Sequence, residues 1–214
     1  MRLGLFRRRF SEHDADALES VRFVVLDTEL TSLDTRSNRL LSVGAIAMRG
    51  PRILLGEQFY KLVNPGIDIP KPGVLIHGLT PGEVEAGDDP AAVLEELAGF
   101  VGSAVLVGHF VAIDLKVLAK ELAAAGRRLT GPAIDTARVQ SWLLRQRPKT
   151  DENLHAMDNL DLISVARSYG LEVAAVHHAL GDAFLTARLW QRMIYALQSA
   201  GIRTLGEALR IGHS

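Results

Sequence analysis

The stretch VRFVVLD, residues 21–27, is an apolar, β-branched run that ends in an aspartate. A run of this length and composition predicts a buried β-strand. Two more strand candidates follow at 39–50 and 52–66. Gly50 and Pro51 form a turn signal between them, so we expect an antiparallel pair. The sheet is therefore predicted to open with three consecutive strands.

Beyond residue 90 the pattern alternates between helical and strand-like segments. The intervening segment 63–83 is rich in proline and glycine and is predicted to be mostly loop. Further strands are expected at 104–109 and, at an edge of the sheet, at 132–136. Helices are expected at 90–103, 112–129 (closing at Gly126), 137–147, 160–170 (capped by Gly170) and 179–199, with a final turn or two in 203–212. This order predicts a layered α/β domain with a mixed sheet.

Length, composition and charge limit the kinds of protein that this sequence can encode. The 214 residues suit one domain, with 48% apolar and 23% charged residues. The sequence has neither an apolar run long enough to span a membrane nor a secretory signal, and it has no cysteine. Any metal must therefore be held by carboxylates or histidines, and a cytoplasmic location is expected. The net charge of −1 argues against extended duplex binding, but it leaves room for local contacts with a few nucleotides.

Four acidic residues are candidates for a catalytic or metal-binding site. Asp27 and Glu29 end the first strand, and their i, i+2 spacing puts both side chains on one face. Asp114 opens a helix beyond the strand 104–109, while Ile113, Val117 and Leu118 are expected to face the core. Asp182 lies within a helix among small and apolar neighbours, where a carboxylate needs a partner. Taken singly, each has an ordinary explanation as a solvated strand end or a first-turn acid.

Taken together, the four acids indicate two-metal phosphoryl transfer. Two divalent cations, Mg²⁺ or Mn²⁺, would need several carboxylate ligands, and a neutral histidine nearby could take a proton from the attacking water. HHALGD, residues 177–182, offers two histidines. Helical i, i+4 spacing selects His178 as the neighbour of Asp182 on one helix face.

The motifs carry a resemblance. FVVLDTELTSLD (23–34), GHFVAIDLKVL (108–118), HHALGDAFLTA (177–187) and IHGLT (76–80) resemble, in order and separation, the motifs of the DEDD exonucleases of the ribonuclease H-like superfamily. The match is to the subgroup with a histidine in the third motif, which includes the proofreading ε subunit of bacterial DNA polymerase III. It covers residues 21 to 195 approximately and implies a ribonuclease H-like fold with a mixed five-stranded sheet flanked by helices.

The resemblance also implies an activity and a division of the chain. Metal-dependent hydrolysis of the 3′-terminal phosphodiester of single-stranded DNA would release nucleoside 5′-monophosphates, in proofreading or repair and with any polymerase on a separate chain. Asp27, Glu29, Asp114 and Asp182 would be the metal ligands. We expect a polar leader at 1–18, an exonuclease domain at 19–200 and a short helical extension at 201–214. RNA 3′-end trimming or oligonucleotide degradation, and a non-catalytic module that binds nucleic-acid ends or a polymerase, are the alternatives.

The family pattern, histidine then aspartate five residues on, selects His177 as general base. Helical spacing and the family pattern therefore point to different histidines. Both can hold if the helix starts near Ala179, because His177 then lies on the incoming loop, where helical spacing does not apply, and His178 supports it. Phe110 stands where the family has asparagine, and it is either a platform for a terminal base or a core aromatic. Candidate substrate contacts implied by the motifs are Thr28, Leu30, Thr31, His77, His109 and Phe110, although His77 could equally be a structural loop histidine.

Two further sequence features are weaker indications of binding partners. Basic residues could hold the substrate backbone, or they could simply form a solvated helix face: Arg138, Arg145, Arg147 and Lys149. RLGLF, residues 2–6, faintly resembles the clamp-binding peptides of replication proteins but has arginine where glutamine is usual, and we treat that likeness as chance.

Overall fold

The computed structural model of the protein describes residues 15–32, 38–67, 78–124, 126, 129, 131–148, 156–173 and 177–213. Its centre is a five-stranded mixed sheet with strand order β3-β2-β1-β4-β5. The strands are β1 (Arg22–Leu30), β2 (Leu40–Arg49), β3 (Arg52–Leu62), β4 (Val105–Gly108) and β5 (Ala133–Asp135). β1, β2 and β3 are antiparallel neighbours, whereas β4 and β5 run parallel to β1. The predicted mixed sheet, its antiparallel opening pair and the edge strand are confirmed.

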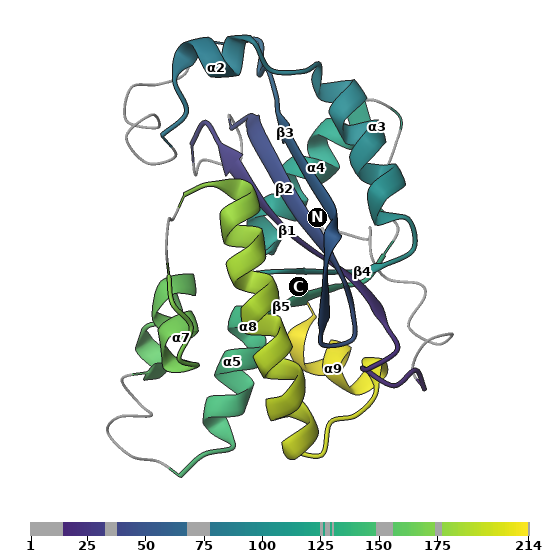
Figure 1. The fold of residues 1–214 in the computed structure, drawn as a ribbon, viewed down its shortest axis with the longest axis vertical. Coiled ribbons are helices and arrows are strands. Elements are labelled where there is room, and N and C mark those ends of the chain that lie inside the picture. The colour runs from purple at the N-terminus through teal and green to yellow at the C-terminus, as the bar shows by residue number, and fades with distance from the viewer. Residues whose placement is uncertain are drawn as a thin grey trace, which may run out of the picture.

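Helices cover both faces of this sheet (Figure 1). The alternation of side chains along β1 decides what each face meets. Phe23 and Val25 pack in one core with α5 (Thr136–Arg145), α7 (Leu162–Ser168), α8 (Ala179–Ser199) and α9 (Leu205–Gly212). Val24 and Leu26 pack in the other with α3 (Pro90–Val101) and α4 (Ala112–Ala124). Successive side chains of β1 therefore pack against different sets of helices.

The structure adds one helix to those predicted and agrees with the predicted end of another. The segment expected to be mostly loop runs into α2 (Pro81–Glu85), which begins with a capping box between Thr80 and Glu83. The helix expected to close at Gly126 ends as α4 at Ala124, and Gly126 follows in the left-handed region with φ 67°. A glycine adopts that conformation without the steric cost of a Cβ, which suits it to a helix end.

Both flanks of the expected central domain contact the core. Leu18 is fully buried, its amide donates to the carbonyl of Arg203, and the amide of Leu205 donates to the carbonyl of Asp16. The expected helical extension is α9, whose buried Leu209 belongs to the α8-side core. Residues 1–14, with the clamp-like RLGLF, lie outside the described residues. In the described part of the chain no helix is both long and apolar enough to cross a membrane.

Candidate active site

Three of the four predicted acids meet at the end of β1. Asp27 and Glu29 project from the strand on its α8 face, and Asp182 comes from the first turn of α8. One carboxylate oxygen from each lies within 4.8 Å of the others. The i, i+2 spacing in β1 accounts for the first two, while packing of α8 across the sheet brings in the third. Carboxylates at such separation form the donor set that a hard divalent cation takes.

Asp114, the fourth acid, reaches the site from the other face of the sheet. It is buried in the first turn of α4, and one of its oxygens accepts a hydrogen bond from the hydroxyl of Thr28. Thr28 lies between Asp27 and Glu29 in β1, so its side chain points toward α4 and away from α8. The hydroxyl of Thr28 thus donates to Asp114, and its expected contact with substrate stays a prediction.

The electrostatics of the cluster favour an added positive charge. Burial, followed by repulsion from Asp114, Asp182 and Glu29, raises the pKa of Asp27 well above its usual value. Burial and the charges of Asp182 and Asp114 raise the pKa of Glu29 to about 7. Burial raises the pKa of Asp114 to about 7, although the Thr28 hydrogen bond opposes it, and burial also raises that of Asp182. A cation between these groups would remove the repulsion.

An unpaired oxygen points to the same conclusion. Asp182 accepts a hydrogen bond from the amide of His177 through Oδ2, at 2.8 Å. Its other oxygen, Oδ1, is buried and has no hydrogen-bond partner among the residues that the structure describes. A buried carboxylate oxygen without a partner is costly unless an ion or a proton satisfies it. The residues present therefore fit a divalent cation.

The two histidines are separated by the start of α8. The helix begins at Ala179, as predicted, with His178 as its N-cap, and His177 precedes it in a left-handed conformation with φ 65°. The side chain of His178 accepts a hydrogen bond from the amide of Gly181 and stacks on the ring of Tyr60. His178 is thus committed to the cap and the stack. The assignment of His177 as general base stays a prediction.

A cross-strand row that the sequence analysis missed determines where α8 lies. Asp27 of β1 pairs with Gly44 of β2, which pairs with Tyr60 of β3. A Cβ at Gly44 would lie 2.2 Å from the backbone nitrogen of Leu180. The helix start therefore lies directly on the sheet, between the Asp27 and Tyr60 side chains. The available signal was an isolated glycine in a strand pattern, which often marks such a close approach.

The turn after β4 is held by a polar network. The imidazole nitrogens of His109 contact the Thr136 hydroxyl at 2.8 Å and the Leu160 carbonyl at 2.6 Å. Burial lowers the pKa of His109. Phe110 follows with φ 52°, and its amide donates to Asp135. Both nitrogens of His109, a predicted substrate contact, are thus engaged within the protein.

Phe110 itself faces solvent, so the core-aromatic alternative is wrong. Its side chain is 46% exposed, and its ring meets that of His109 edge to face at 4.8 Å. Ile113 was expected in the core and is 38% exposed, because α4 buries Asp114 and Leu115 in its place. The turn thus presents an aromatic ring to solvent four residues before Asp114.

The remaining residues that were predicted to bind substrate lie in different surroundings. Thr31 is buried, and its hydroxyl accepts the amide of Arg39, while Leu30 packs at the edge of the α4-side core. His77 and Lys149 lie outside the described residues. The three described basic residues of the expected backbone-binding set are exposed on or just after α5: Arg138, Arg145 and Arg147.

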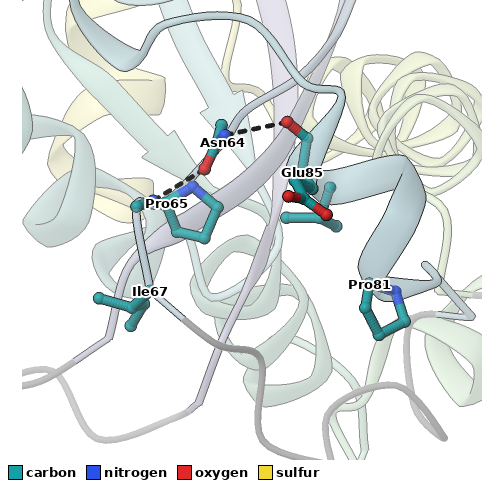
Figure 2. Close-up of a pocket in the computed structure, with 7 residues that line it drawn as sticks. Asn64, Pro65, Ile67, Pro81 and Glu85 are labelled. Carbon is teal, nitrogen blue, oxygen red and sulfur yellow. Dashed lines mark hydrogen bonds between the residues drawn. The ribbon is translucent and has the colours of Figure 1, made fainter.

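A pocket beyond β3 contains none of the predicted site residues. Figure 2 shows Asn64 donating to the carbonyl of Glu85 and accepting the amide of Gly66, with Pro65, Ile67 and Pro81 around them. These side chains supply no cluster of acids or nucleophiles. The chemistry of the described residues is therefore concentrated at the ends of β1 and α8.

Comparison with known sequences decides the family. The profile of the exonuclease family matches residues 24–190. The chain belongs to this family. The match runs from β1 into α8 and includes all four acids of the site.

Individual relatives of the exonuclease chain differ in length. A DNA polymerase III subunit epsilon-like protein of Rhodobacter capsulatus is 30% identical over 195 residues, which are 90% of this chain and 26% of that protein. The DNA polymerase III subunit epsilon of Aquifex aeolicus is 28% identical and is covered to 85%, as is this chain. E. coli exonuclease I, solved with a dT13 oligonucleotide, superposes with a TM-score of 0.71 at 18% identity, covering 85% of this chain and 43% of that one. This last likeness confirms the ribonuclease H-like fold.

Proposed function

We propose that this protein is a divalent-metal-dependent 3′–5′ exonuclease that acts on single-stranded DNA and releases nucleoside 5′-monophosphates. The observation that carries the proposal is the carboxylate cluster of Asp27, Glu29 and Asp182, with its unpaired buried oxygen on Asp182. Membership of the exonuclease family supports the reaction class. A module that only bound nucleic-acid ends would have no use for clustered, mutually repelling acids.

The four acids share one task in this proposal, and neighbouring groups hold two of them in place. Asp27, Glu29 and Asp182, with Asp114 at the neighbouring position, would hold two Mg²⁺ or Mn²⁺ ions. Such ions, when bound, supply an activated water and neutralise charge on the phosphate. Thr28 fixes the orientation of Asp114, and the amide of His177 fixes Asp182. The acids remain preorganised because these hydrogen bonds come from the backbone and from a buried side chain.

His177 would take the proton of the attacking water. Water adds to phosphorus while the bond to the 3′-oxygen of the preceding nucleotide breaks, so that one product carries the 5′-phosphate and the other the 3′-hydroxyl. His177 is exposed and, unlike His178, is not the N-cap of α8. Its imidazole is therefore available to the substrate side.

Single-stranded DNA is the proposed substrate, with Phe110 as a platform for a base. An exposed ring suits stacking on any base, because every base has a π-face. The solved complex of E. coli exonuclease I with dT13 supports DNA as the substrate. Relatives named DNA polymerase III subunit epsilon support proofreading or repair beside a separate polymerase. RNA trimming is tested as an arm of the experiment below.

The test is digestion of matched DNA and RNA single strands, labelled at the 5′ end, with Mg²⁺ or Mn²⁺. A descending ladder of labelled products on DNA, together with free mononucleotides, is the expected result. Asp27→Asn, which removes a charge with little change in size, should abolish the ladder. Faster digestion of the RNA strand would transfer the activity to RNA. If the parent protein degraded neither strand with either metal, the enzyme proposal would be lost.

A further inference from the structure

We propose that Tyr60 and His178 are positioning residues of this site, and that their stacked rings hold the turn that presents His177 and Asp182. Neither residue is assigned a part in the hydrolysis. The inference rests on the proposed function for its catalytic consequence. Its structural content concerns one turn of chain and is independent of the reaction.

The ring of His178 is held by two separate contacts. Its centroid lies 4.6 Å from that of Tyr60, and the two planes are inclined by 24°, which is a stacked arrangement. Its Nδ1 accepts the amide of Gly181 at 3.3 Å and so caps α8. The cap fixes the ring relative to the helix, and the stack fixes it relative to β3. Together the two contacts tie the first turn of α8 to the sheet.

The turn that these contacts hold is strained. His177 has φ 65°, a conformation that a residue with a Cβ rarely adopts and that persists only where surrounding contacts impose it. From this conformation its amide donates to Asp182 Oδ2 at 2.8 Å. The amide of Asp182 in turn donates to the carbonyl of His178 at 2.9 Å. A shift of His178 would therefore disturb both residues.

The anchor on the other side is strand β3 of the central sheet. Tyr60 is paired with Gly44, and Gly44 with Asp27, so the Tyr60 and Asp27 side chains leave the same face of the sheet about 10 Å apart. The start of α8 lies between them, over Gly44. The stack thus ties the turn that contains His177 to the same sheet that carries Asp27.

The experiment compares Tyr60→Leu, which loses the ring, with Tyr60→Phe, which keeps it. His178→Asn keeps a capping acceptor but loses the stack. The first readout is hydrogen exchange of the His177 amide by NMR. An aromatic pair of this kind should slow opening of the turn by about two- to tenfold, so exchange should quicken by that factor in Tyr60→Leu and in His178→Asn. Tyr60→Phe should exchange like the parent.

The second readout is the division between kcat and KM on single-stranded DNA. Misplacing His177 and Asp182 should lower kcat about tenfold in Tyr60→Leu and His178→Asn, with KM changed by less than about twofold. The double variant should lose no more than either single variant, because one stack is removed in all three. Tyr195→Leu is the matched control: this tyrosine is 52% exposed on the far part of α8 and should leave both readouts unchanged.

Three outcomes would overturn the inference. One is unchanged exchange of the His177 amide in both ring-removing variants. Another is full additivity in the double variant. The third is loss of kcat in His178→Asn alone, which would make His178 itself the proton acceptor. A parent protein without nuclease activity would defeat the proposed function, while the exchange measurement would still decide whether the stack holds the turn.

Discussion

The substitution Gly44→Ala tests how closely the site depends on contact between α8 and the sheet. The added methyl group would lie 2.2 Å from the nitrogen of Leu180 and 2.3 Å from the carbonyl carbon of Ala179, both backbone atoms of the helix start. To reach ordinary van der Waals separation the helix must move by more than about 1 Å, carrying Asp182 with it. A displacement of that size in a catalytic constellation lowers turnover by about 100-fold. Overpacking should also destabilise the fold by about 1–3 kcal/mol.

The assay for Gly44→Ala is kcat/KM on a single-stranded oligonucleotide, beside calorimetric unfolding without metal. Gly56→Ala is the control, because Gly56 also lies in a strand and a Cβ there would meet nothing within 4 Å. We expect kcat/KM to fall about 100-fold in Gly44→Ala and Tm to fall by roughly 2–12 °C, with neither changed in Gly56→Ala. Activity of Gly44→Ala within twofold of the parent, at unchanged Tm, would refute the argument that backbone contact at Gly44 places Asp182.

Three further outcomes follow from the site. In the metal-free protein, the raised pKa of Glu29 means that the folded state keeps a proton that the unfolded state has lost, so this group makes stability fall as the pH rises from about 4.5 to about 7. The other three acids, whose pKa values are also raised, contribute a slope of the same sign. Glu29→Gln should therefore reduce the slope in thermal unfolding with EDTA, and an equal slope in both proteins would exclude a contribution from Glu29. His177→Ala should lower kcat by about 10²–10⁴-fold and leave Mn²⁺ affinity, measured by calorimetry, within a fewfold of the parent; a larger loss in His178→Ala would reverse the assignment. Phe110→Leu should raise KM on single-stranded DNA by about 5- to 100-fold with kcat preserved, and an unchanged KM would discard base stacking.

Much of the fold was accessible from the sequence because its strongest signals are local. The apolar run at 21–27 had no other favourable placement than a buried strand, and the turn at Gly50 and Pro51 left the following strands only an antiparallel pairing. The face shared by Asp27 and Glu29 follows from the pleat alone. The start of α8 at Ala179 could be predicted because two arguments named different histidines as the partner of Asp182. Helical spacing named His178 and the family pattern named His177, and both could hold only if the helix began there.

The missed features depend on contacts between residues distant in sequence. No local pattern shows that Gly44 lies under α8, or that Tyr60 lies opposite Gly44 and beside His178. The turn at Phe110 illustrates the same limit, because its amide is held by Asp135, 25 residues further on. Helix α2 was missed because proline and glycine outweighed the capping pair that starts it.

The arrangement of the acids explains why the end of β1 suits this chemistry. A β-strand sends alternate side chains to opposite faces, so Asp27 and Glu29 can meet α8 while Thr28 meets α4. Asp114 and Asp182, from those two helices, therefore approach one strand from opposite sides, and only at its end can both approach the same point. A one-residue slip of β1 against β2 would exchange these faces and turn Asp27 and Glu29 together away from Asp182. The register that pairs Asp27 with Gly44 is thus a condition of the site as well as of the sheet, because the same pair admits α8 and aims the first carboxylate at it.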